Sequence, residues 1–425
     1  MSAITKIAAM VVLFSGALFP DCAIAADSSQ GISATVSNLG DSTNVLFILI
    51  GGFMILFMHG GFAFLEVGSV RTKNQVNALN KILCEYGFSC LAYLFIGYAI
   101  ANGSGLLGPI SDHNANSGID YVKFFMYLGF AACIPAIISG GVAERAKFWT
   151  NSLAGFIFVA IVYPFIEALT WGGPADGSWL AAAQIWLQTN VGEFSDFAGS
   201  VIVHGVGGWI ALPAIILLGP RIKSDSIKVS SIPWLALGSW MLIVGWFSFN
   251  VMSAGNIQDV SGLVAINSLL AMVGGTLAAL VISKNDAGFV HNGALAGLVA
   301  ICAGSNVYHP LAALFVGAVA GAIFVYMFSI ETEKMKIDDV LGVWPLHGIC
   351  GVWGGLAVGL FVAEVSFMTQ LIYTLMIVGI SVLAGFIVYG LLKRFVGIRL
   401  DENEELKGSD LTIHKIQSNP EDAIG

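Results

Sequence analysis

Residues 196–212 read DFAGSVIVHGVGGWIAL, an apolar run with His204 near its middle. A second run, DDVLGVWPLHGICGVWGG at 338–355, carries His347. A titratable side chain at membrane depth is costly and normally faces the interior of a helix bundle or a path through it. Glycines follow both histidines, at Gly205 and Gly348, and glycine lets another segment approach closely. The two runs therefore predict a helical membrane protein with a polar pair inside its bundle.

The composition supports the same class. Of 425 residues, 57% are hydrophobic and 11% are charged, about half the charge of a soluble domain. The sequence has no cluster of basic residues of the kind that binds nucleic acid, so nothing indicates a nucleic-acid partner. Apart from Cys22, the cysteines lie in apolar segments and lack the spacing of a disulfide framework or a metal site. We therefore expect no metal and no cofactor, and membrane lipids as surroundings.

The beginning of the chain has the features of a cleavable signal peptide. Residues 1–25 hold Lys6, a short apolar run and the small-residue site Ala23-Ile24-Ala25. A retained first span is the alternative. We expect a membrane domain at 26–397, followed by a cytoplasmic tail at 398–425 that is polar and acidic.

Eleven apolar runs have about the twenty residues needed to cross a bilayer. They lie at 44–67, 79–102, 122–144, 148–171, 194–219, 231–252, 259–283, 287–305, 308–329, 338–363 and 369–396. With the mature N-terminus outside, every lysine and arginine after residue 25 except Lys123 falls on the cytoplasmic side, as the positive-inside rule requires. We expect an all-α polytopic protein that is N-out and C-in.

The histidines also suggest an internal repeat, because His204 falls in span five and His347 in span ten. Five is odd, so a second group of five spans would be inverted relative to the first. Inverted repeats with a site near the midplane recur among membrane transporters. We therefore expect spans 1–5 and 6–10 to form a pseudo-twofold inverted repeat, with span 11 added.

Five motifs around these histidines resemble those of the ammonium transporter family, to which the Rhesus proteins are related. They are GFAFLEVGSVRTKN at 61–74, GGVAERAKF at 140–148, DFAGSVIVHGVGG at 196–208, GWFSFNVMSAGN at 245–256 and DDVLGVWPLHGICG at 338–351. The resemblance covers residues 44–414. It implies a multi-pass homotrimer of the bacterial inner membrane with one pore per subunit. Ammonium or ammonia would be the substrate, methylammonium an analogue, and nitrogen uptake the purpose.

The resemblance also implies an outer site for the cation. Phe130, Trp171 and Ser253 would form an aromatic cup with one hydroxyl acceptor. Phe130 and Phe249 would stack below the cup as a gate, and Asp196 would be a buried structural carboxylate beside it. Aromatic faces attract a desolvated cation, and a serine oxygen adds a directional acceptor. One turn before Phe130, where relatives often have an aromatic residue, this chain has Met126, so we expect a weaker cup.

Below the gate, the resemblance places His204 and His347 along a narrow pore. Ammonium can lose a proton and potassium cannot. An apolar pore whose polar groups are two imidazoles would therefore pass ammonia and exclude permanent cations. Burial disfavours a charged imidazole, so we expect an uncharged pair that is able to relay a proton between ring nitrogens.

Three further features lie near the cytoplasmic side. Glu144 and Arg145 suggest a structural ion pair, and Glu66, late in span one, requires a buried polar partner that the sequence does not identify. The segment 408–414, GSDLTIH, resembles a family tail that docks under the pore and communicates with nitrogen regulators of the PII type.

Two other functions remain open from the sequence. One is an ammonium sensor that conducts little, although residues 398–425 do not resemble the signalling domain that such members often carry. The other is a Rhesus-like channel for neutral gas, in which a cation cup built with Trp171 and Ser253 would have little purpose.

Overall fold

The computed structural model describes residues 28–108, 118–222, 229–257 and 260–419. The signal peptide expected at 1–25 and the basic residues Lys223 and Lys228 lie outside the described residues. The chain divides into two units, residues 1–43 and residues 44–425. The contacts discussed below all lie within the second unit.

Helices account for nearly all of the regular structure, and an isolated bridge joins Ala146 and Arg399. The α-helices are α2 (Ser28–Ser69), α3 (Gln75–Ala92), α4 (Tyr98–Asn102), α6 (Ile119–Val142), α7 (Phe148–Ile157), α8 (Tyr163–Thr170), α9 (Trp179–Asn190), α10 (Val206–Leu218), α11 (Ile232–Val251), α12 (Ser261–Ile282), α13 (Ala287–Ile301), α14 (Pro310–Ser329), α15 (Cys350–Phe361), α16 (Phe367–Phe395) and α17 (Glu402–Lys407). The tighter or wider turns are η1 (Thr72–Asn74), η2 (Tyr93–Gly97), η3 (Phe158–Val162), η4 (Ser200–Gly205), η5 (Met252–Ala254), η6 (Ile330–Lys334), η7 (Trp344–Ile349) and η8 (Asp410–His414).

Among the described residues, ten continuous helical stretches are long and apolar enough to cross a membrane. They are Thr35–Ser69, Thr72–Asn102, Ile119–Val142, Phe148–Thr170, Ser200–Leu218, Ile232–Ala254, Ser261–Ile282, Pro310–Lys334, Trp344–Phe361 and Phe367–Phe395. The run expected at 287–305 gives the shorter helix Ala287–Ile301, because the chain turns at 302–307. The protein is therefore an all-α, multi-pass membrane protein. The count of eleven spans stays a prediction.

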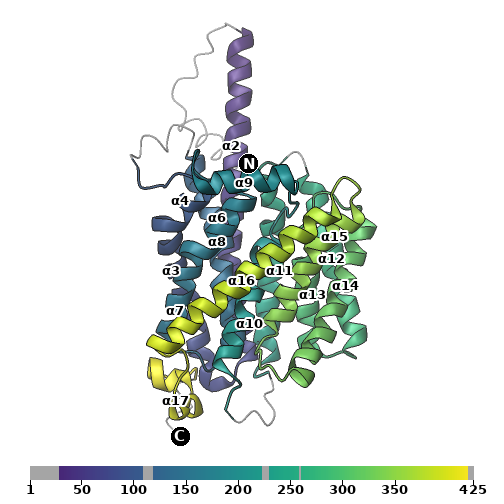
Figure 1. Cartoon of the computed structure of the whole chain (residues 1–425). Coiled ribbons are helices and arrows are strands. Elements are labelled where there is room, and N and C mark those ends of the chain that lie inside the picture. The colour runs from purple at the N-terminus through teal and green to yellow at the C-terminus, as the bar shows by residue number, and fades with distance from the viewer. Residues whose placement is uncertain (1–27, 109–117, 223–228, 258–259, 420–425) are drawn as a thin grey trace, which may run out of the picture. The chain divides into compact units, whose positions relative to one another are not determined.

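Close backbone contacts hold the bundle together. α10 packs against α6 and α16, and α12 packs against α13 and α14. Figure 1 shows α16 running obliquely across the bundle, where it contacts α10 and α15. A Cβ atom added at Gly317 would lie 2.1 Å from the carbonyl oxygen of Ala271, so α12 and α14 touch backbone to backbone. Such close approach is how helices gain packing energy in lipid, where apolar burial offers no drive.

The ion pair expected between Glu144 and Arg145 does not form. Glu144 instead pairs with Arg71 and, at 2.8 Å, with Arg221. The Arg145 guanidinium donates to backbone carbonyls, including that of Gly219 at 2.8 Å. The two side chains serve different neighbours because Glu144 takes a left-handed backbone conformation, with φ at 69°, which turns the chain sharply between α6 and α7.

The buried partner of Glu66 is a lysine. Lys81 Nζ lies 2.8 Å from one carboxylate oxygen of Glu66, and the Ser139 hydroxyl donates to the other at 2.6 Å. This pair joins α2, α3 and α6, and all three side chains are buried. Pairing compensates two charges that would be costly alone inside the bundle.

The C-terminal segment folds back against the bundle, at the end opposite to α9 (Figure 1). Asp410 accepts hydrogen bonds from the backbone N–H groups of Val76 and Asn77, at 3.0 and 2.9 Å. These amides open α3, so Asp410 caps that helix from a distant part of the chain. His414 Nε2 lies 3.0 Å from the Asn77 side-chain oxygen.

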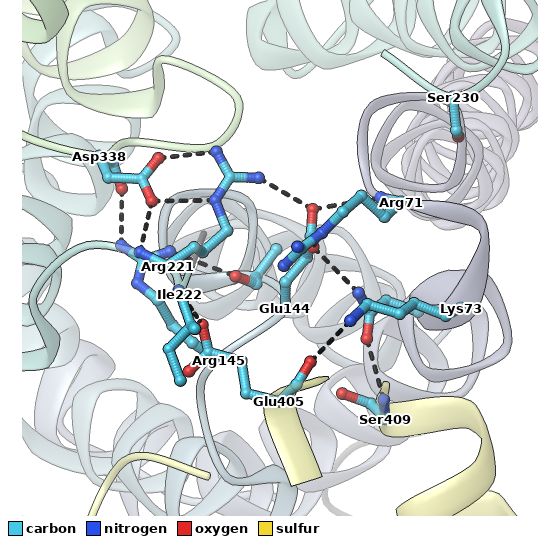
Figure 2. Close-up of polar contacts among 12 residues, drawn as sticks. Arg71, Lys73, Glu144, Arg145, Arg221, Ile222, Ser230, Asp338, Glu405 and Ser409 are labelled. Atoms are coloured by element: carbon cyan, nitrogen blue, oxygen red, sulfur yellow. Dashed lines mark hydrogen bonds and ion pairs between the residues drawn. The ribbon is translucent and has the colours of Figure 1, made fainter. Parts of the chain in front are cut away.

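Figure 2 shows a polar cluster where this segment meets the bundle, with Arg71, Lys73, Glu144, Arg145, Arg221, Asp338, Glu405 and Ser409. Asn74 joins it through hydrogen bonds with Glu144 and Ser409, and we call these nine residues the tail-end cluster. Lys73 Nζ donates to the Glu405 carbonyl at 2.8 Å. The Arg221 guanidinium holds both oxygens of Asp338, at 2.6 and 2.9 Å. Burial opposes ionisation of Asp338, but the hydrogen bonds and charge of Arg221 outweigh it and lower the pKa of this carboxyl to about 2.

Candidate functional site

The two histidines lie on segments built in the same way. His204 belongs to η4 and His347 to η7, both π-helical turns that lead directly into α-helices. A glycine with left-handed backbone lies five residues before each histidine, Gly199 with φ at 89° and Gly342 with φ at 68°. A side chain at either glycine would strain the turn. π-helical turns within α-helices are rare and frequent at functional sites.

An aspartate begins each segment, eight residues before the histidine. The Asp196 carboxylate accepts hydrogen bonds from the backbone N–H groups of Ser200, Val201 and Ile202, at 2.7, 2.8 and 2.9 Å. Asp339 accepts from the Trp344 N–H at 2.9 Å. Both carboxylates therefore cap the turns that carry the histidines. Sequence reasoning missed Asp339, although the spacing D-x-x-G-x-x-x-x-H occurs at both 196–204 and 339–347.

Glycines allow the two segments to cross in contact. A Cβ atom at Gly208 would lie 2.2 Å from the Gly348 nitrogen, and one at Gly351 would lie 2.3 Å from the Ser200 carbonyl oxygen. Neither position has room for a side chain. This approach brings the Nδ1 atoms of the two histidines to 3.3 Å, within reach of one shared hydrogen bond.

Aromatic rings surround the histidine pair. The Trp246 indole stacks on the His204 ring, with centroids 4.6 Å apart. Trp246 is fully buried, and its Nε1 donates to the Cys302 sulfur at 3.2 Å. His204 Nε2 is buried and has no hydrogen-bond partner among the described residues. One ring nitrogen of the pair is thus left with hydrogen-bonding capacity inside an apolar surrounding. Trp246 lies within a motif that the sequence singled out, but its role was not predicted.

Phe249 connects the histidines to a second ring, Phe130. The His204 and Phe249 centroids are 5.5 Å apart, and those of Phe249 and Phe130 are 4.3 Å apart. The two phenylalanine planes meet at 70°, edge to face, which differs from the stacked arrangement expected from the sequence. Edge-to-face packing places the positive edge of one ring on the negative face of the other. Both rings are buried, and their contacts connect the Trp171 ring to the His204 ring.

A pocket of about 550 Å³ lies beyond these rings. Phe130, Trp171 and Ser253, which the sequence analysis assigned to a cation cup, all line this pocket, and their role as a cup stays a prediction. Trp171 Nε1 donates to the Asp196 carbonyl at 2.8 Å. Asp196 therefore holds Trp171 through its backbone and the His204 turn through its carboxylate. The Ser253 hydroxyl donates to the Phe249 carbonyl at 2.8 Å, which leaves its oxygen lone pairs as acceptors.

Tyr127 and Glu167 are among the pocket residues that the sequence analysis did not assign. Met126 lines the wall where relatives often have an aromatic residue, but Tyr127 lines the same pocket. The Tyr127 ring stacks near Phe130, with centroids 6.4 Å apart. The pocket therefore has an aromatic ring at Tyr127, the residue that follows Met126 in the sequence. Glu167 adds a carboxylate to the same lining.

On the other side of the histidine pair, a small cavity of about 10 Å³ is lined by His347, Phe62 and Leu341. Leu341 also borders a pocket of about 720 Å³ at the end of the bundle near the tail-end cluster, where Arg221 and Asp338 line the wall. The order along the bundle is thus a pocket, a pair of phenylalanines, a pair of histidines, a small cavity and a second pocket. Narrow apolar constrictions separate two wider, more polar spaces.

A family model described as "Ammonium Transporter Family" matches residues 46–418, most of the chain. The chain belongs to the ammonium transporter family. It is 35% identical over 421 residues to the ammonium transporter Amt2 of Methanocaldococcus jannaschii, covering 93% of this chain and 96% of that protein. Its resemblance to the family, inferred from five motifs, is confirmed.

Solved structures give the same family of folds. A "Sensor Amt Protein" superposes with a TM-score of 0.81 at 29% identity, covering 89% of this chain and 99% of that one. Nitrosomonas europaea Rh50 gives 0.72 at 26% identity, covering 90% and 95%. The neighbours therefore include a protein named as a sensor and one of the Rhesus family.

Proposed function

We propose that this protein transports ammonium across the cytoplasmic membrane. The observation that carries the proposal is a continuous series of ring contacts, which runs from Trp171 through Phe130 and Phe249 to His204 and His347. Neighbouring centroids along this series lie between 4.3 and 6.2 Å apart. It joins a pocket suited to a small cation to a buried pair of imidazoles. The Amt-named relatives support the same substrate.

In the proposed cycle, ammonium enters the pocket and exchanges water for the faces of Trp171 and Phe130. Cation–π attraction of this kind is worth up to about 2 kcal/mol when desolvated. The Ser253 oxygen accepts one of the four N–H groups. The buried phenylalanine pair then opens by side-chain rotation, because in its closed form it leaves no path.

Below the gate the cation meets an apolar bore and gives up its proton. Ammonia continues past the histidines, where ring nitrogens exchange hydrogen bonds with it. The unpartnered Nε2 of His204 accepts the proton, and His204 passes its own Nδ1 proton to His347 Nδ1, 3.3 Å away. His347 then releases its Nε2 proton on the far side, where it rejoins ammonia. Potassium has no proton to lose, so the same bore excludes it.

The shared Asp–Gly–His construction of η4 and η7 supports the inverted repeat predicted from the sequence. We further propose the predicted orientation, with the tail-end cluster in the cytoplasm of a bacterial inner membrane and the aromatic pocket outside. A homotrimer and a PII-type regulator bound at the tail are part of this proposal by family resemblance.

Two alternatives are tested by the same assays. The likeness to a sensor Amt protein favours a receptor that conducts little. The likeness to Rh50 favours a neutral-gas channel. Uptake of labelled methylammonium by cells without their own transporters separates transport from sensing: uptake no better than empty vector, with protein in the membrane, refutes transport. Charge movement on adding ammonium to reconstituted protein excludes a purely neutral channel.

A further inference from the structure

Glu167 places a carboxylate in the aromatic pocket. It lies on α8, one helical turn before Trp171, and lines the same space of about 550 Å³ as Phe130 and Ser253. Its side chain is almost completely buried within the protein. The backbone carbonyl of Glu167 also accepts hydrogen bonds from Trp171 and Gly172, so the carboxylate and the indole are fixed to the same turn.

The carboxylate has one neutral partner. The Tyr93 hydroxyl lies 3.0 and 2.8 Å from its two oxygens, and it has one proton to donate. Among the ion pairs of the described residues, none includes Glu167. A carboxylate has about four acceptor positions, so most of this capacity is unused. A glutamine would accept the same hydroxyl without the cost of a buried charge, and stability alone does not favour glutamate here.

We propose that Glu167 is the anionic ligand of the pocket and that it binds the incoming cation directly. This inference rests on the proposed function. Ammonium and methylammonium carry N–H donors and a positive charge, and a carboxylate offers both a charge and an acceptor. The rings of Phe130 and Trp171 supply attraction without a formal charge. Tyr93 is a positioning residue that holds the carboxylate toward the space.

Lys123 provides an internal test of this electrostatic role. It lines the same pocket but is exposed, and its charge opposes that of Glu167. Removing the lysine should strengthen cation binding if charge governs the site. The effect should be smaller than that of Glu167 because solvent screens an exposed charge.

The experiment measures the half-saturating substrate concentration in four variants. Ammonium is the substrate when the transport current is recorded, and methylammonium is the substrate when uptake is measured. Glu167→Gln should raise it about tenfold, because a charge-assisted hydrogen bond is lost. Glu167→Asp keeps the charge and should lie closer to the unchanged protein. Lys123→Gln should lower it about twofold. Asp176→Asn removes an exposed carboxylate that does not line the pocket, and should leave it unchanged.

A purely structural Glu167 predicts the reverse ranking. Glutamine keeps the length and the hydrogen bond to Tyr93, whereas aspartate is too short, so Gln would then be the milder change. That ranking, or a Glu167→Gln half-saturation equal to that of the unchanged protein, overturns the inference. Should Glu167→Gln not reach the membrane, an unchanged half-saturation in Lys123→Gln overturns it. If the unchanged protein moves neither ammonium nor methylammonium, the proposed function itself fails.

Discussion

The crossing of the two histidine segments gives the most direct structural prediction. Gly208→Ala adds a Cβ atom 2.2 Å from the Gly348 nitrogen and 2.6 Å from its Cα. Ordinary contact begins near 3.4 Å, so the segments must separate by about 1.2 Å. If that displacement is transmitted to the ring nitrogens now 3.3 Å apart, their distance rises to about 4.5 Å, which is too long for a hydrogen bond.

The expected result is a transporter that is present but slow. A lost hydrogen bond of about 1 kcal/mol, together with a disturbed path, should lower the maximal rate about tenfold. Overpacking a backbone contact should also lower the free energy of unfolding by about 1–3 kcal/mol. The assay is methylammonium uptake normalised to the amount of protein in the membrane, with thermal unfolding of the purified protein as the second measurement.

Gly205→Ala is the matched control. It lies in the same segment, next to His204, but its added Cβ atom would meet other atoms no closer than 3.4 Å. We expect transport near the level of the unchanged protein. The reasoning is refuted if Gly208→Ala transports normally at normal abundance, or if Gly205→Ala loses as much activity.

Three further predictions concern the pocket, the tail-end cluster and the C-terminal segment that caps α3. Trp171→Leu should raise the half-saturating ammonium concentration about tenfold, because about one to two kcal/mol of cation–π attraction is lost. If affinity and rate in uptake assays are unchanged, Trp171 is not part of the site. The pKa of Asp338 is about 2 in the folded protein and near 4 in the unfolded chain. Its ionised form therefore stabilises the fold by about 2 kcal/mol above about pH 4, and this stabilisation is lost as pH falls through about 2. Thermal melts should therefore show Arg221→Gln less stable than the unchanged protein near pH 6, with the difference shrinking near pH 2; a constant difference contradicts this. Asp410→Ala removes the cap of α3 and should cost about 1 kcal/mol in the same melts, whereas an unchanged melting temperature would show that the docked tail does not support this helix.

The membrane fold was predictable because apolar length and glycine content are local properties of the sequence. The run at 287–305 shows where this reasoning ends. Composition does not reveal that the helix stops at Ile301, since contacts from elsewhere in the chain fix the turn that follows. The Phe197 N–H donates to the Ala303 carbonyl, and the Ala198 N–H donates to the Cys302 carbonyl.

The site residues divide in the same way. Phe130, Trp171, Ser253 and Phe249 were assigned to the proposed site from family motifs, because single residues of common types carry no local signal. Asp339 was within reach of sequence reasoning, since its spacing to His347 repeats that of Asp196 to His204.

Tyr127, Trp246 and Glu167 required the structure. Each is buried or partly buried on a helix with other aromatic or apolar residues, and only the packing of separate helices decides which side chain faces the path. The partners of Glu144 and Glu66 were missed for the same reason, because they come from helices far away in the sequence.

In the proposed mechanism, the histidine pair supports ammonium transport and excludes potassium. Purified protein in liposomes on a supported membrane tests it through the current evoked by a step in ammonium or potassium concentration. We predict a current with ammonium and none with potassium. His204→Ala and His347→Ala should each remove most of the ammonium current. The loss in the double variant should be much smaller than the sum of the two single losses, because the rings act as one coupled unit. Normal ammonium currents in both single variants, with potassium still rejected, would show that the histidines are structural and do not carry transport.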